Sequence, residues 1–111
     1  VAGGQTESIF RAIVDAIQAS KLRWRLYDKN VKPLTFANAF YLATKGGGEF
    51  FGKVGSFESG YEFDAVVLDD SALLHPQQLD LLQRLERFAY LSGDVCGGVV
   101  AKFVQGEKIA L

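Results

Sequence analysis

Hydrophobic positions near the start of the chain repeat with the period of an α-helix. The apolar residues at this helical spacing are Ile9, Phe10, Ile13, Val14, Ile17 and Trp24. They fall on one face, and the polar residues between them fall on the other. We therefore expect an amphipathic helix from about Glu7 to Trp24, with Glu7 in its first turn. Gln5 or Thr6 is the expected capping residue.

A second, shorter helix is predicted after Thr35, whose hydroxyl suits the capping position. The apolar face of this helix is Phe36, Ala39, Phe40 and Ala43. Glycine just past a helix commonly adopts the left-handed conformation that ends it. We therefore expect Gly46–Gly48 to end the helix, and Glu49–Phe51 to add one turn that buries two aromatic rings.

One continuous apolar run and three further segments predict β-strands. Residues 65–68 lack polar alternation, which is typical of a strand covered on both faces. Residues 54–57 are expected to form a short strand before it, followed by a turn at Ser59-Gly60. Residues 99–104 form the last long strand, and residues 108–111 return beside it as a hairpin partner.

A third helix is predicted for about residues 77–90. Pro76 suits the first position of a helix, because the N–H that proline lacks is not needed there. The apolar stripe of this helix is Leu79, Leu82, Leu85, Phe88 and Ala89. Arg84, Glu86 and Arg87 are expected on the solvated face.

The composition bounds the class of protein. The 111 residues suit one domain, and with 49% of them hydrophobic the chain is not of a disordered type. A net charge of −1 gives no electrostatic basis for binding nucleic acid or an anionic membrane, and no apolar run is long enough to span a bilayer. We expect neither partner. Cys96 is the single cysteine and cannot form an internal disulfide, so we expect a reducing, cytoplasmic environment.

The residues that could carry chemistry are few. His75 is the only histidine, and it precedes a proline, where capping or solvent exposure is the usual role. Cys96 has no adjacent basic residue, so we expect it to pack or to lie in a turn. Asp69 and Asp70 could bind a hard cation, but acids at a strand end are usually solvated. A zinc site that activates water needs several imidazoles and a carboxylate, so we assign no catalytic, substrate-binding or metal residue.

The stretch from Ala43 to Asp70, ATKGGGEFFGKVGSFESGYEFDAVVLDD, is more specific than its elements require. It resembles the amidohydrolase superfamily, in which such a linker leaves a catalytic (β/α)8 barrel and re-enters a small β-domain. This stretch and the opening VAGGQTESIFRA are most similar to the guanine deaminase family, and the resemblance extends to residues 103–108. The chain has no methionine, even at position 1, which fits either a processed start or a C-terminal piece of a longer chain. Because of the resemblance, we expect the C-terminal piece.

The resemblance implies a fold, which we state as an expectation. The fold class would be α/β: the C-terminal segment of a (β/α)8 amidohydrolase barrel plus the returning strands of its small composite β-domain. Residues 1–50 would end the catalytic barrel with a loop, its last helix and the following helices. Residues 51–111 would return to the small β-domain, with one helix at about 77–90. Gly3 and Gly4 match the family's loop at the barrel mouth and could shape the active site.

The resemblance also implies an activity. The longer protein would be a zinc-dependent enzyme of purine catabolism that hydrolyses guanine to xanthine and ammonia. Guanine would be its substrate, zinc its cofactor, and the N-terminal remainder of the chain the structural partner of this segment. The segment itself would be scaffold, inactive alone and without its own zinc. A homodimer stays open.

Two alternatives stay open. Another amidohydrolase, such as a nucleobase deaminase or a chlorohydrolase, would share the linker. A self-contained, non-enzymatic α+β interaction module would instead begin at Val1. In the family a metal-binding aspartate directly precedes this segment, so an aspartate before Val1 would favour the enzyme.

Overall fold

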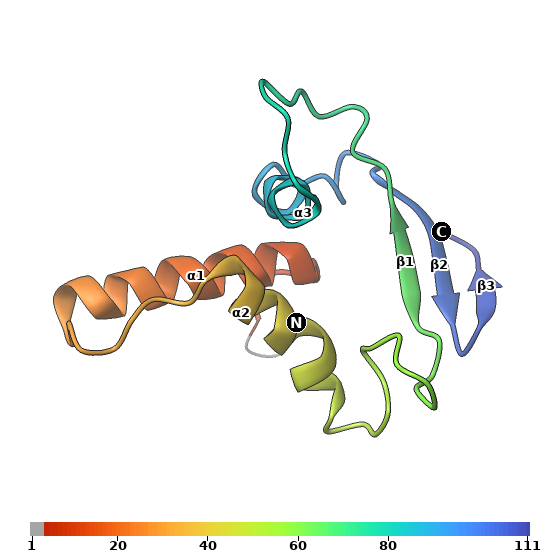
Figure 1. Ribbon diagram of the computed structural model, residues 1–111, viewed down its shortest axis with the longest axis horizontal. Helices are drawn as coiled ribbons and strands as arrows, with labels where there is room; N and C mark the ends of the chain where they lie inside the picture. The colour runs from red at the N-terminus through yellow and green to blue at the C-terminus, as the bar shows by residue number, and fades with distance from the viewer. Residues whose placement is uncertain (1–3) are drawn as a thin grey trace.

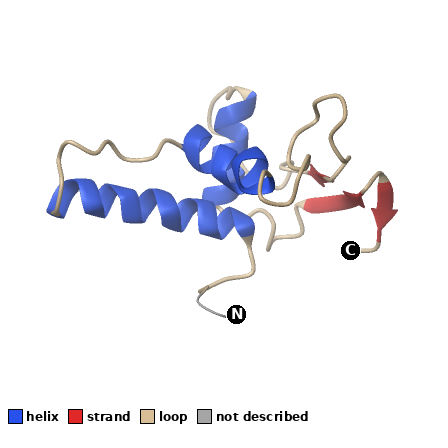
Figure 2. Cartoon of the chain, turned by 90° about the horizontal axis from the view of Figure 1, so that it is seen from below, coloured by secondary structure: helices blue, strands red, loops and turns tan. Residues whose placement is uncertain are grey.

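The helices gather at one end of the molecule and the strands at the other (Figure 1, Figure 2). The structure is a computed structural model that describes residues 4–111. In chain order the elements are α1 (Ile9–Leu26), α2 (Phe36–Tyr41), the π-helix η1 (Leu42–Gly46), β1 (Ala65–Leu68), α3 (Leu81–Tyr90), β2 (Val99–Val104) and β3 (Glu107–Ile109). The predicted mixture of helices and strands is confirmed.

The helix α1 begins later than predicted. Ser8 is the N-cap, and its hydroxyl accepts the backbone N–H of Arg11 at 3.1 Å. The hydroxyl of Thr6 instead accepts the N–H of Ser8 at 3.0 Å. The prediction of Gln5 or Thr6 as the cap is therefore wrong, and Glu7 lies before the helix rather than in its first turn.

The segment formed by α2 and η1 starts as predicted but ends differently. Thr35 is the N-cap, and Asn38 completes a capping box with it. The chain then widens into a π-helix and stays helical through Gly48, because Gly47 keeps a helical φ of −70°. The predicted left-handed glycine cap is wrong. Glycine serves close packing here, since a Cβ on Gly48 would lie 2.5 Å from the carbonyl oxygen of Val54.

The segment between η1 and β1 is irregular. The strand predicted for residues 54–57 is absent, because Gly55 has a φ of +79° that a strand does not accommodate. The turn at Gly60 is confirmed by its φ of +86°. The predicted burial of Phe50 and Phe51 is wrong: these rings are 87% and 80% exposed and pack edge to face on each other at 5.1 Å.

The strands form one antiparallel sheet in the order β1-β2-β3. The predicted ranges of β1 and β2 are confirmed, and β3 begins at Glu107, one residue earlier than predicted. Gln105 and Gly106 have positive φ angles of 51° and 83°, which is the geometry of a type I′ hairpin turn. The described residues do not cover β1 on both faces as predicted, since Val66 and Val67 are 50% and 45% exposed.

The helix α3 begins at Leu81, four residues later than predicted. The Asp80 carboxylate accepts the N–H of Gln83 at 2.8 Å, and the Gln83 side chain accepts the N–H of Asp80 at 3.0 Å. This capping box sets the start of the helix, so the prediction that Pro76 occupies its first position is wrong.

The hydrophobic core lies where α1 packs against α2 and α3. Its buried members are Phe10, Ile13, Ile17, Phe36, Ala39, Phe88 and Ala89. The rings of Phe10 and Phe88 meet edge to face with centroids 5.3 Å apart, and Phe88 is only 1% exposed. Of the predicted apolar face of α1, Phe10, Ile13 and Ile17 are buried as expected, Val14 is only partly buried, and Ile9 and Trp24 are exposed.

The surface is unusually large and apolar for the size of the chain. Its accessible area is 8255 Å² for a mass of 12.1 kDa. A folded monomer of that mass exposes about 6,000 Å². The radius of gyration is 15.4 Å, compared with about 13 Å for a compact domain of this length. Of the helices in residues 4–111, none combines the length and apolarity needed to cross a membrane.

By itself, the 111-residue chain should self-associate or lack a cooperative unfolding transition. The physical reason is that exposed apolar faces and open edges at β1 and β3 favour contacts between copies. Sedimentation velocity and a denaturant melt measure the two properties. A monomer with a cooperative transition of several kcal/mol would contradict this expectation.

Candidate functional site

The residues selected from the sequence do not converge on one site. Gly3 lies outside the described residues, and Gly4 is exposed ahead of α1. Cys96 is a free, exposed thiol in the turn between α3 and β2, as expected. His75 and Asp70 do come together, in a polar cluster that the sequence did not reveal.

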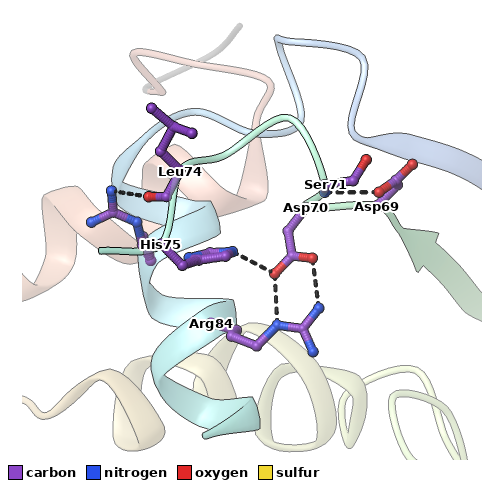
Figure 3. A network of polar contacts seen from close by, with 7 residues as sticks. Asp69, Asp70, Ser71, Leu74, His75 and Arg84 are labelled. Atoms are coloured by element: carbon purple, nitrogen blue, oxygen red, sulfur yellow. Dashed lines mark hydrogen bonds and ion pairs between the residues drawn. The ribbon is translucent and has the colours of Figure 1, made fainter. Parts of the chain in front are cut away.

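This polar cluster joins the segment after β1 to α3 (Figure 3). Arg84 contacts both carboxylate oxygens of Asp70, with Nε donating to Oδ2 at 2.8 Å and Nη2 to Oδ1 at 2.6 Å. His75 Nε2 lies 3.1 Å from Asp70 Oδ2. Arg87 Nη2 donates to the carbonyl oxygen of Leu74 at 2.5 Å. The expectation of a solvated Asp70 is wrong, since its side chain is only 16% exposed.

Hydrogen bonding sets the charge state of the two acids at the end of β1. The hydrogen bonds from Arg84 lower the pKa of Asp70 from 3.8 to about 2, against the opposing effect of desolvation. The same contact raises the pKa of Arg84. Hydrogen bonds from Ser71 lower the pKa of Asp69. Both carboxylates are therefore ionised at neutral pH.

The geometry of the cluster is that of a structural clamp. The Asp70 carboxylate is shared between Arg84 and His75, which together make three hydrogen bonds to its two oxygens. Across residues 4–111, no group of three or more His, Cys, Asp or Glu side chains is placed to hold a metal ion. The sequence does show an acid after a strand, Asp70, and an arginine in the first turn of the next helix, Arg84. This combination is too common in proteins to predict that the two side chains are in contact.

A second ion pair fastens the irregular loop to η1. Lys45 Nζ lies 2.6 Å from Glu58 Oε2 and 5.6 Å from the centroid of the Tyr61 ring. Their hydrogen bond raises the pKa of Lys45 and lowers that of Glu58. Because the pair is solvated, its contribution to stability is small.

Besides these polar contacts, the structure has an apolar hollow of about 780 Å³ between the helices and the sheet. Its lining draws on α1, α2, β1, α3 and β2 through Ile9, Ile13, Phe40, Val66, Leu85 and Val99. Ile9 is 52% exposed and Val66 is 50% exposed. Branched aliphatic side chains in such a hollow are suited to packing against other apolar side chains rather than to catalysis.

Replacing Arg84 by Met should destabilise the fold above about pH 4, and this effect should be lost below about pH 2. The pKa of Asp70 is lowered in the folded state, so its contribution is present above the unfolded pKa and is lost as the pH falls through about 2. A pH series of thermal melts on a folded protein that carries this segment measures the difference. Arg84→Lys is the control, since it keeps the charge without the two-point contact. Equal melting temperatures for the parent and Arg84→Met at pH 7 would contradict the clamp.

Comparison with known proteins finds similarity to guanine deaminases. No family model matches the chain. It is 32% identical over 116 residues to the guanine deaminase of Dictyostelium discoideum and 36% identical over 108 residues to that of Homo sapiens. The two matches cover 98% and 94% of this chain but only 25% and 22% of the relatives. The chain therefore spans about a quarter of their length.

The structural comparison finds the same kind of protein as the sequence comparison. The crystal structure of guanine deaminase from C. acetobutylicum, with guanine bound in its active site, matches the chain with a TM-score of 0.89 and 48% identity. The match covers 99% of this chain and 26% of that one. The agreement thus extends over the whole described fold rather than over one motif. By sequence and by fold, this chain is homologous to the guanine deaminases across a segment that makes up about a quarter of their length.

Proposed function

We propose that this chain is part of an enzyme that hydrolyses guanine to xanthine and ammonia. In that reaction the bond from the ring carbon to the exocyclic amino nitrogen breaks, and the same carbon gains the oxygen of a water molecule. The observation that carries the proposal is the 48% identity and TM-score of 0.89, over 99% of the chain, to a guanine deaminase with bound guanine. The role of the chain within the enzyme is scaffolding.

The described residues do not supply the reacting groups themselves. The only histidine, His75, is engaged with Asp70. No metal-ligand cluster occurs in the described range from 4 to 111. These residues therefore do not fit the zinc that the resemblance implies, and we place the metal ligands and the reacting groups outside this segment.

We place α1 as the last helix of a (β/α)8 barrel and the β1-β2-β3 sheet in a small β-domain. The apolar hollow supports this placement, because its uncovered aliphatic side chains need a hydrophobic partner. The open edges of the sheet can pair with further strands. The division at residue 50 would leave α3 in the second part, although α3 packs on α1. The two parts would thus share a core.

A chimera in which these 111 residues replace the matching segment of the C. acetobutylicum enzyme should deaminate guanine. Since the segment is scaffold, we expect kcat/KM to stay within about tenfold of the natural enzyme, which is about 1.4 kcal/mol of transition-state free energy. The loss of guanine absorbance measures the rate, and the host enzyme without the segment is the control. A folded chimera that keeps its metal and does not deaminate guanine would contradict the proposal.

In the same chimera, Ile13→Ala should cost about 2–5 kcal/mol of unfolding free energy, because Ile13 is only 3% exposed. Ile9→Ala tests the hollow. Ile9 is 52% exposed in this chain. If other parts of the enzyme cover Ile9, the substitution should cost at least about 1 kcal/mol of unfolding free energy. Gln18→Ala, on the exposed side of α1, is the control. A cost for Ile9→Ala below about 0.5 kcal/mol, as for an ordinary surface site, would show that the hollow has no partner.

A further inference from the structure

The start of α1 is held by a side chain from a distant part of the chain. Ser8 Oγ donates a hydrogen bond to Asp94 Oδ2 at 2.5 Å, and the two residues are 86 positions apart. The same Oγ accepts the N–H of Arg11, so one hydroxyl both caps the helix and contacts Asp94. Asp94 also places a negative charge beside the N-terminus of an 18-residue helix, where the helix dipole favours it.

Asp94 is itself placed by tight packing. It lies in the turn between α3 and β2, next to Gly93, whose N–H donates to the carbonyl oxygen of Phe88 at 2.9 Å. A Cβ on Gly93 or on Gly98 would lie 2.5 Å from the Phe88 ring, so both glycines are pressed against it. That ring packs in turn on Phe10 of α1. The turn and the first turn of α1 are therefore parts of one rigid unit.

The contact between Ser8 and Asp94 has no substitute nearby. In the described range, residues 4–8 make no other hydrogen bond or ion pair with a part of the chain beyond α1. A hollow of about 330 Å³ surrounds the contact, with Gln5, Thr6 and Ser92 among its lining residues. Within the described residues, this hydrogen bond is therefore the contact that ties residues 4–8 to the turn after α3.

We propose that Asp94 is a positioning residue, which fixes residues 4–8 through Ser8 and so shapes one wall of the active site. This inference rests on the proposed function. In a (β/α)8 barrel the active site lies at the carboxyl ends of the strands, where the helices that follow them begin. With α1 as a barrel helix, residues 4–8 connect that face to the helix. Asp94, from the part of the chain beside the sheet, then couples the small domain to the barrel mouth.

The test compares Asp94→Ala, Asp94→Asn and Ser20→Ala in the chimera. Asp94→Ala should lower kcat by between about tenfold and about 100-fold, the cost of a displacement of about 1 Å at an active site. Asp94→Asn keeps an acceptor for Ser8 and should recover most of the loss. Ser20 is the matched control at the other end of α1, where its hydroxyl bonds the carbonyl oxygen of Ile17 at 2.7 Å and the N–H of Leu34 at 2.9 Å. Its loss should lower stability and leave kcat unchanged.

Hydrogen exchange at residues 4–12 of the chimera provides a readout that does not depend on turnover. The backbone N–H of Arg11 donates a hydrogen bond to the Ser8 hydroxyl. Asp94→Ala should speed hydrogen exchange at this N–H, and Ser20→Ala should not. If the chimera turns over guanine and Asp94→Ala keeps kcat within about twofold, the positioning role is wrong. If a folded chimera that keeps its metal is inactive, the proposed function fails, and unchanged exchange in Asp94→Ala would separately overturn the role of Asp94 in holding residues 4–8.

Discussion

The packing of α1 against α2 and α3 is the interaction on which the rest of the structure depends. Phe88 lies at its centre, against Phe10 on one side and the two glycines of the following turn on the other. Because α3 also carries Arg84, the same helix fastens the end of β1 through Asp70. Loss of this packing would therefore disrupt three features at once: the core, the contact between Asp70 and Arg84, and the turn that carries Asp94.

The same core is small for the length of chain that it must order. The buried hydrophobic residues of the described range are Phe10, Ile13, Ile17, Phe36, Ala39, Phe88, Ala89 and Ala101. Far more large apolar side chains of the described range stay exposed than are buried, among them Ile9 and Val66. This imbalance, together with the uncovered hollow, argues against a self-contained interaction module. It is the behaviour expected of a scaffold segment whose other faces are covered within a larger enzyme.

Local signals in the sequence predicted much of the fold. The period of α1, the cap at Thr35, the two apolar strands and the glycine of the last hairpin each act within a few neighbouring residues. Some failures were local, since the Asp80–Gln83 capping box that starts α3 is itself a short sequence signal. Others depend on contacts between distant residues. Gly55 is bent away from a strand where its backbone meets Thr44, and Asp70 is drawn from solvent by an arginine 14 positions away. No periodicity encodes such contacts, and the family resemblance, rather than any catalytic motif, pointed to the function.

The uncovered apolar faces of this chain should pack against the rest of a guanine deaminase fold. Fragment complementation tests it: residues 1–111 are co-expressed with the C. acetobutylicum enzyme truncated to remove its matching segment. We expect a one-to-one complex, isolated by size exclusion, that deaminates guanine although neither fragment does so alone. Two fragments that elute separately, with this chain as a folded monomer, would contradict it.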